Sequence, residues 1–341
     1  MLYFEKFVSR YLDALLYEIK TRYKGEEIKK IYIGGGTPSA LNIKETKKLF
    51  EIIKKFKIST ESEFTIECNI NDITPEKIKL YKNNGVNRIS LGIQTFNKKV
   101  LIKMNRNHDY NIVKEKIELL KKNGIKNINV DLIYAFPETT ILDLKNDLDL
   151  FFSLDVNHIS TYSLMIEPHT MLFINKTKKI NEELDYDMYN FICKEMENHG
   201  FIHYEISNFC LPGYESKHNL TYWNNLEYYG FGLGASGYIG NLRYTNTLSF
   251  DKYLEHKFIF EEENLTLKDK KIYELILGFR KINGINIDEF NQKYNDNILD
   301  KSLIKKLIND KNLIVKENFI KIPYEKIYIQ NEILLEVLDY E

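Results

Sequence analysis

The chain has 341 residues and a formal net charge of -1, and 43% of its residues are hydrophobic. This composition is typical of a soluble globular protein, and it gives no global attraction to nucleic acid or to an anionic membrane. The length suits one large domain with an appendage, or two modest domains.

The first residues carry apolar side chains at spacings of three and four positions, as in Phe4, Phe7, Tyr11 and Leu15. Charged residues interrupt this pattern, which predicts an amphipathic helix and not a signal peptide. No apolar stretch approaches the ~18 residues that a membrane-spanning helix needs. We therefore expect a cytoplasmic protein. The three cysteines, Cys68, Cys193 and Cys210, are odd in number and widely spaced, which predicts reduced thiols.

Short apolar runs then alternate with longer segments of helical period, which predicts successive strand and helix units around a parallel sheet. The expected strands are 31–33, 64–67, 88–92, 128–133 and 158–164. Thr74 before Pro75, Asn97 and Thr140 are expected to begin helices. Gly85 and Gly124 end two of these helices in the same sequence context, which favours a barrel-like repeat.

Polar residues and glycines follow the expected strands, where a barrel of this kind places its ligand-binding residues. They are Gly34, Gly35, Gly36, Thr37, Glu67, Gln94, Asp131 and Glu167. Each has a structural alternative, such as a tight turn, a salt bridge or a helix cap, but their convergence favours a binding site. The glycines lack the lysine of a phosphate-binding loop and the spacing of a dinucleotide motif. The exposed backbone carbonyls and amides of these glycines could instead bind a zwitterionic amino-acid group.

The alternation stops near residue 170. Residues 204–253 are rich in tyrosine, asparagine and glycine, and we expect them to form mostly loops. Helical patterns return from Leu265, and a β-rich stretch at 313–322 precedes a last helix, which predicts a small winged-helix-like domain. Acidic residues at the end of the chain argue against a nucleic-acid partner. The expected divisions are 1–170, 171–262 and 263–341.

Several of these strings resemble, in order and spacing, the motifs of the coproporphyrinogen-oxidase-like radical SAM family. They are 34–39, Glu67, 88–96, Arg106 with His108, 131–133, 158–164, Glu167, 204–209, 218–223 and 230–235. The resemblance implies an α/β fold, a partial (βα)6 TIM-like barrel without its first strand, joined to a small C-terminal α+β domain. It also implies that the strand end at Gly34, Gly35, Gly36 and Thr37 binds the methionine part of S-adenosylmethionine. Glu67, Gln94, Arg106 and Asp131 are then expected to line that site.

The string His-Asn-x-x-Tyr-Trp resembles the haem-associated motif of the HemW-type haem-chaperone branch of this family. It assigns candidate haem contacts to His218, Asn219, Tyr222 and Trp223. An imidazole is a good axial iron ligand, and aromatic rings pack against a flat macrocycle. The structural alternative is a tryptophan core anchor beside a histidine that hydrogen-bonds the backbone. Cys210 is interpreted as a small buried hydrophobic residue.

The resemblance implies a haem chaperone that delivers haem to acceptor proteins and associates peripherally with membrane partners. The alternatives are an oxygen-independent coproporphyrinogen III oxidase and an inactive scaffold. The family holds a [4Fe-4S] cluster in a CxxxCxxC loop, which is absent from residues 1–341. We expect that loop and the first strand to precede Phe4, so no catalysis is expected of the chain as written. A misassigned start codon or a truncated gene is favoured over a cluster-free relative, because the residues expected to bind S-adenosylmethionine at the strand ends are retained. We call these residues the rim: Gly34, Gly35, Gly36, Thr37, Glu67, Gln94, Arg106 and Asp131.

Overall fold

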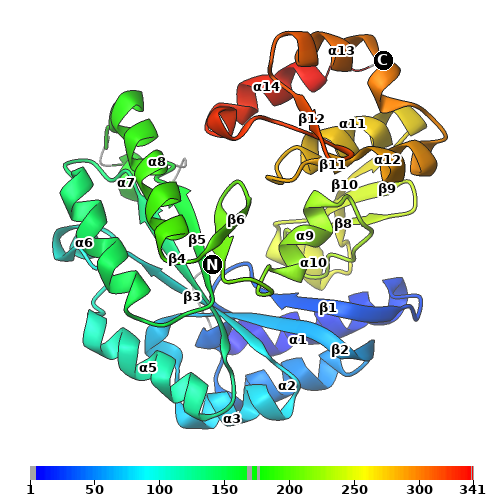
Figure 1. Ribbon diagram of the computed structural model, residues 1–341. Helices are drawn as coiled ribbons and strands as arrows, with labels where there is room; N and C mark the ends of the chain where they lie inside the picture. Colours follow the sequence, from blue (N-terminus) through cyan, green and yellow to red (C-terminus); the bar gives the residue numbers. More distant parts are fainter. Residues whose placement is uncertain (1–4, 167–170, 175–176, 339, 341) are drawn as a thin grey trace. The chain divides into compact units, whose positions relative to one another are not determined.

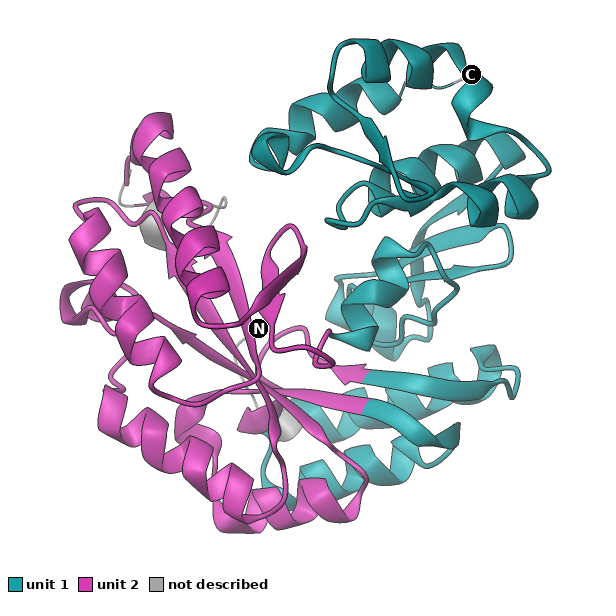
Figure 2. Ribbon diagram, viewed as in Figure 1, with its two compact units in different colours: residues 1–31, 41–63, 216–341 teal, residues 32–40, 64–215 magenta. Residues whose placement is uncertain are grey.

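The computed structural model describes residues 5–166, 171–174, 177–338 and 340 (Figure 1). They fall into two compact units (Figure 2). Unit 1 comprises residues 1–31, 41–63 and 216–341, and unit 2 comprises residues 32–40 and 64–215. The three-part division expected from the sequence stays a prediction.

Seven strands form one mixed sheet, in the order β1-β2-β3-β4-β5-β7-β6. Their bounds are β1 Glu27–Ile33, β2 Lys57–Cys68, β3 Arg88–Gln94, β4 Asn127–Tyr134, β5 His158–Ser163, β6 Ile202–Glu205 and β7 Asn208–Cys210. Strands β2 to β5 pair in parallel, whereas β7 is antiparallel to both β5 and β6. The five expected strands are therefore confirmed, and β6 and β7 add an antiparallel edge.

The helices that alternate with these strands begin where the sequence predicts. Thr74 caps α3 (Pro75–Asn83), Asn97 caps α4 (Lys98–Lys103), and Thr140 forms a capping box at the start of α6 (Ile141–Phe152). Gly85 and Gly124 have φ angles of +89° and +84° beyond the ends of α3 and α5 (Tyr110–Lys122). A side chain is unfavourable in that left-handed conformation, so glycine ends both helices. Unit 2 also contains η1 Pro38–Ala40, η2 Ile70–Asp72, α7 Met171–Ile174 and α8 Glu182–Asn198.

Strands β3 and β4 have two different faces. Ile89, Leu91 and Ile93 are fully buried, as are Ile128, Val130 and Leu132. They alternate with polar residues such as Ser90 and Asn129, because successive side chains of a strand point to opposite sides. Figure 1 shows α3, α5 and α6 on the outer side of these strands. The apolar face therefore packs on helices, and the inner face is left for polar groups.

Unit 1 contains the expected N-terminal helix, α1 (Glu5–Arg22), in which Leu12, Leu15 and Ile19 are buried. It also contains α2 (Ile43–Ile53) and a three-stranded antiparallel sheet in the order β10-β9-β8. The other elements of this part are α9 Lys217–Trp223, β8 Ser236–Ile239, β9 Leu242–Asn246, α10 Phe250–Leu254 and β10 Ile259–Asn264. Residues 204–253 are thus more regular than their loop-like composition predicts.

The C-terminal elements confirm the predicted succession of helices, β-rich stretch and final helix. They are α11 Leu267–Gly278, β11 Ile285–Asn286, α12 Ile287–Tyr294, η3 Ile298–Asp300, α13 Ser302–Asn309, β12 Ile314–Lys316, β13 Phe319–Lys321, η4 Tyr324–Lys326 and α14 Gln330–Val337. Strands β11, β13 and β12 form a small antiparallel sheet. No helix among the described residues is both long and apolar enough to cross a membrane.

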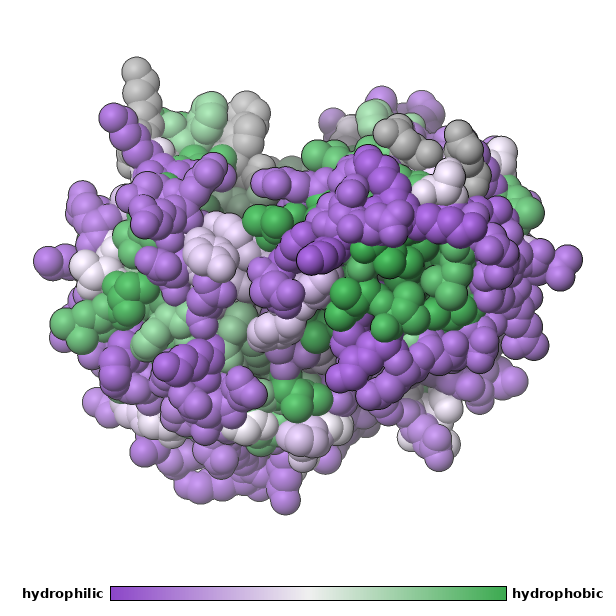
Figure 3. All heavy atoms as spheres, turned by 45° about the horizontal axis from the view of Figure 1, so that its top comes forward, coloured by the Kyte–Doolittle hydropathy of each residue, from purple (hydrophilic) through white to green (hydrophobic). Residues whose placement is uncertain are grey.

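Exposed hydrophobic side chains occur in the C-terminal segment of unit 1: Ile314, Val315, Tyr324, Ile329, Leu335 and Leu338. Figure 3 shows a hydrophobic area surrounded by hydrophilic residues on the face that it displays. Leu335, on the last helix, is 66% exposed. A contiguous exposed apolar area is typical of an interaction surface, whereas single exposed apolar side chains are common on any protein.

Candidate cofactor and haem sites

The polar inner face of unit 2 is organised in levels that run across the strands. One level holds Glu67, Ser90, Asn129 and His158, and the next level toward the strand ends holds Gly92, Asp131 and Ser160. Residues in register on neighbouring parallel strands point to the same side of a sheet. The register therefore brings candidate residues from different strands onto one face.

Glu67 and Gly34 lie against one another at the first strand end. The Tyr32 hydroxyl donates a hydrogen bond to Glu67 Oε1 at 2.7 Å. A Cβ atom placed on Gly34 would lie 2.7 Å from that same oxygen and from Tyr32 Cε1. Because real Cβ atoms do not approach other atoms so closely, position 34 requires glycine for Glu67 to keep this place.

Gly92, Gln94 and Arg106 form a second contact group at the end of β3. Arg106 Nη1 donates to the carbonyl of Gly92 at 2.6 Å. The pairing register shifts between Gly92 and Gln94, and Gln94 adopts a φ angle of +77°. Its Oε1 is buried and has no hydrogen-bond partner among the described residues. Backbone strain and an unpartnered buried acceptor both occur preferentially at ligand sites.

Asp131 stands beside these groups on β4. Burial raises the pKa of its carboxyl to about 6, and the negative charge of Glu67 acts in the same direction, whereas the hydrogen bond from Asn129 opposes it. Burial lowers the pKa of the Arg106 guanidinium, and the charge of Asp131 counteracts that effect. Asp131 is therefore close enough to both Glu67 and Arg106 for electrostatic interaction, as charged ligands of one small molecule would be.

The remaining rim residues lie on the exposed turn that follows β1. Gly35 and Gly36 have φ angles of +81° and +145°, and a Cβ atom on either would meet no atom within 4 Å. Thr37 is exposed, and its carbonyl accepts from the backbone of Ala40 at 2.9 Å. These glycines are thus required by conformation and not by crowding. Glu167 lies outside the described residues.

The four candidate haem contacts lie on α9 in unit 1. His218 and Tyr222 are four residues apart, as are Asn219 and Trp223, so the four side chains share about 140° of the helix circumference. The rings of His218 and Tyr222 meet edge to face with centroids 4.7 Å apart. The sequence spacing therefore gives one aromatic face that carries an imidazole.

Both ends of α9 are held by polar contacts within unit 1. Ser216 caps the helix, and Glu63 accepts from the backbone amides of Lys217 and His218 at 3.2 and 3.0 Å. At the other end, Lys281 Nζ donates to Asn224 Oδ1 at 2.6 Å. The guanidinium of Arg280 lies 5.8 Å from the centre of the Trp223 ring. Two cations therefore lie near the end of the helix that carries the candidate motif.

The cysteines of the chain do not fit an iron-sulfur cluster. Cys68, Cys193 and Cys210 form no disulfide with one another and are far apart in the sequence. Burial raises the pKa of the Cys68 thiol well above its ordinary value and that of Cys210 to about 12, which disfavours the thiolates that a cluster needs. Among the described residues, no three His, Cys, Asp or Glu side chains are grouped to hold a metal ion.

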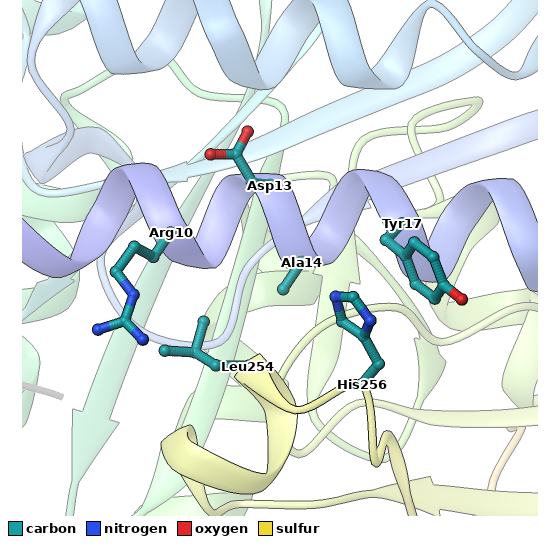
Figure 4. A pocket seen from close by; sticks show the side chains of 6 residues that line it. All are labelled: Arg10, Asp13, Ala14, Tyr17, Leu254 and His256. Atoms are coloured by element: carbon teal, nitrogen blue, oxygen red, sulfur yellow. The ribbon is translucent and has the colours of Figure 1, made fainter.

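A hollow of about 410 Å³ in unit 1 contains none of the candidate residues (Figure 4). It is lined by Arg10, Asp13, Ala14, Tyr17, Leu254 and His256. Figure 4 shows that the first four come from α1 and that His256 faces Tyr17. These two rings stack at 3.9 Å with planes 9° apart. The hollow is therefore partly closed by its own side chains and is separate from the predicted sites.

Comparison with known proteins decides the family. Residues 3–151 match the model of the Radical SAM superfamily. The chain is 40% identical to the heme chaperone HemW of Lactococcus lactis over 84% of this chain and 78% of that protein. It is 37% identical to the heme chaperone HemW of Bacillus subtilis over 96% of this chain and 90% of that protein. The chain belongs to the HemW family.

A solved structure shares the fold of this HemW family member. Coproporphyrinogen III oxidase HemN from Escherichia coli, described as a radical SAM enzyme, superposes with a TM-score of 0.84. The superposition covers 97% of this chain and 83% of that one, at 20% sequence identity. At that identity the likeness concerns the architecture alone. It confirms the expected fold class, an α/β radical SAM barrel with a C-terminal extension.

Sequence reasoning missed two buried polar groups of this HemW family member. One is the set Asn129, His158 and Tyr204 behind Asp131, and the other is Glu18 on α1. The glycine-rich string 230–235 proved to contact the second group, because the Gly232 amide donates to Glu18 Oε2 at 2.9 Å. The sequence carried one signal for these groups, a polar residue at a position where the strand or helix pattern expects an apolar one. A single sequence does not distinguish such a buried polar residue from a solvent-exposed one.

Proposed function

We propose that this chain is a haem chaperone, which binds haem as cargo and passes it to acceptor proteins in the cytoplasm, including partners at the membrane surface. The observation that carries the proposal is the aromatic face of α9 with its imidazole, in a chain of the HemW family. Relatives of 30 to 40% identity carry the name heme chaperone HemW. The absence of a disulfide among the three cysteines suits a reducing compartment.

The surroundings of α9 supply each kind of contact that haem needs. His218 offers an axial nitrogen ligand, and Tyr222 and Trp223 offer apolar ring surface. The Trp223 Nε1 is buried without a hydrogen-bond partner among the described residues, and an unsatisfied buried donor of this kind calls for a functional explanation. Arg280 and Lys281 are cations that suit the propionate carboxylates of the macrocycle.

Titration of the purified protein with haem is expected to give saturable binding with a shifted Soret band. His218→Ala should weaken that binding at least about tenfold, which corresponds to about 1.4 kcal/mol, because the axial nitrogen is lost. The matched control is His256→Ala, an exposed histidine of the same unit that stacks on Tyr17. It should bind haem like the wild type. Equal losses in the two variants, or no saturable binding at all, would contradict the proposed role of His218.

We also assign S-adenosylmethionine to the polar rim of unit 2. This ligand offers a zwitterionic amino acid, a ribose diol and an adenine, and it carries a positive sulfonium. Glu67 and Asp131 can accept from its ammonium and hydroxyl groups, Arg106 can face its carboxylate, and Gln94 retains a buried unpartnered acceptor. The glycines after β1 leave backbone amides and carbonyls exposed to the amino-acid group.

Gly34→Ala should weaken S-adenosylmethionine binding by about tenfold or more, measured by isothermal titration, because the new Cβ displaces Glu67. The matched control is Gly200→Ala in the same unit, where φ is +78° and a Cβ meets nothing within 4 Å. That variant should lose about 1 kcal/mol of stability through backbone strain and keep its affinity. An unchanged affinity in Gly34→Ala would remove the rim from the binding site.

The cluster has no fitting ligands in residues 1–341, so no radical step is derived for this chain. What its own residues do is bind, hold and orient: the rim holds a small zwitterion, and α9 presents a haem-binding face. Reconstitution of the cluster requires a CxxxCxxC loop. Binding of haem and of S-adenosylmethionine can be tested without the cluster.

A further inference from the structure

A row of polar side chains, the buried Asn129 and His158 and the half-buried Tyr204, crosses from β4 to β6 behind the Asp131 carboxylate. Asn129 Nδ2 donates to Asp131 Oδ1 at 2.8 Å, and His158 Nδ1 lies 2.6 Å from Asn129 Oδ1. His158 Nε2 lies 2.8 Å from the hydroxyl of Tyr204. Since His158 is fully buried and Asn129 is 3% exposed, their polar groups are satisfied mainly by one another and not by bulk water.

The Asp131 carboxylate at the end of this row fixes the direction of every hydrogen bond in it. An ionised Asp131 carboxylate only accepts, so the amide nitrogen of Asn129 faces it and the amide oxygen faces His158. That oxygen also only accepts, so the imidazole carries its proton on Nδ1. Burial lowers the pKa of His158 well below its ordinary value, which leaves Nε2 unprotonated as the acceptor for the Tyr204 hydroxyl. All three donors therefore point toward Asp131.

We infer that Tyr204, His158 and Asn129 are positioning residues, which hold the Asp131 carboxylate in one orientation to accept from hydroxyl or ammonium groups of S-adenosylmethionine. This inference rests on the rim site proposed above. Two serines complete the arrangement: Asn129 Nδ2 also donates to Ser90 Oγ at 2.8 Å, and Ser160 Oγ donates to Asn129 Oδ1 at 3.1 Å. Rotation of the amide would break four bonds at once, and aligned hydrogen bonds strengthen one another.

Other charged and titratable groups act on Asp131 from neighbouring elements, and they must stay constant in a test. Glu67 raises and Arg88 lowers the pKa of the Asp131 carboxyl, and Ser160 also lowers it by hydrogen bonding. Asp131 in turn raises the pKa values of Tyr32, Tyr162 and Arg106. The row is therefore probed by substitutions of its uncharged members, and Asp131 itself is replaced only as the background of the binding test.

A ligand-free measurement tests the row independently of cofactor binding. Nitrogen-15 spectra of the wild-type protein should show the Nδ1-protonated, neutral form of His158 throughout about pH 5 to 8. Asn129→Leu should move the carbon-13 titration midpoint of Asp131 upward, since a hydrogen bond that favours the ionised form is lost. A protonated Nε2, or an unmoved midpoint, would overturn the inference.

A binding measurement then separates positioning from mere folding. Tyr204→Phe and Asn129→Leu should weaken S-adenosylmethionine binding about threefold and at least about tenfold. In an Asp131→Ala background the same substitutions should lower the affinity for S-adenosylmethionine less than about twofold, because they act through the carboxylate that is then absent. The control is Tyr81→Phe, a buried tyrosine of the same unit that hydrogen-bonds Cys68, and it should leave binding unchanged. Equal losses in both backgrounds would overturn the inference. A wild-type protein that binds no S-adenosylmethionine would refute the cofactor site, and the spectra would still decide the row.

Discussion

Replacing Glu18 by glutamine is expected to lower the free energy of unfolding of unit 1 by about 3 to 5 kcal/mol. The Glu18 side chain is fully buried on α1, and its two oxygens accept from four donors. Oε1 accepts from Arg22 and from Asn246 Nδ2, while Oε2 accepts from the Gly232 amide and the Tyr253 hydroxyl. Glutamine has the same shape, but it turns one acceptor into a donor and leaves the Arg22 cation unpaired.

The only tryptophan of the chain, Trp223, reports on this unit, so its fluorescence during urea unfolding measures the effect. Asp13→Ala is the control on the same helix. It removes an ion pair with Lys48, in which the two side chains are 64% and 34% exposed, and should cost no more than about 1 kcal/mol. Similar midpoints for the two variants would mean that the buried contacts of Glu18 contribute little.

The local signals of the barrel were predictable because they depend on neighbours in the sequence. Thr74, Asn97 and Thr140 begin helices, and Gly85 and Gly124 end them, through bonds that reach no more than a few residues. The strands were predictable from apolar runs, and their parallel order follows from the helices between them. The rim follows in turn, because parallel strands end on the same side of a sheet.

The long-range polar contacts could not be predicted in this way. Glu18 has the composition of a solvated helix position, and only pairing with residues more than 200 positions later buries it. His158 begins a strand and was interpreted as part of a motif, while its partners come from β4 and β6. The antiparallel β6 and β7 were missed for the same reason, since short strands beside a helix have no period of their own.

Asp131→Asn is expected to stabilise unit 2 by about 1 to 3 kcal/mol near pH 8 while it weakens S-adenosylmethionine binding. Burial raises the pKa of this carboxyl to about 6 in the folded protein, from an unfolded value of 3.8. Between these values the folded state binds more protons than the unfolded state, so its stability falls as pH rises from about 4 to 6 and stays low above that range. Asparagine carries no charge, so this dependence is removed, but it presents only one acceptor to a ligand.

Hydrogen exchange of the β4 amides between about pH 4 and 8 measures the effect, as the difference in protection between the wild type and Asp131→Asn. Burial also raises the pKa of Asp147 to about 6, so this second carboxyl adds a dependence in the same range. Asp147, on α6, accepts from the Phe96 amide at 2.8 Å and from the Thr95 hydroxyl. Asp147→Asn should therefore remove its own share of the pH dependence and leave the cofactor affinity intact. If the difference in amide protection between wild type and Asp131→Asn stays constant from about pH 4 to 8, ionisation of Asp131 does not destabilise the folded protein. The hydrogen bonds from Asn129 and Ser160 would then fully offset the burial of this carboxylate.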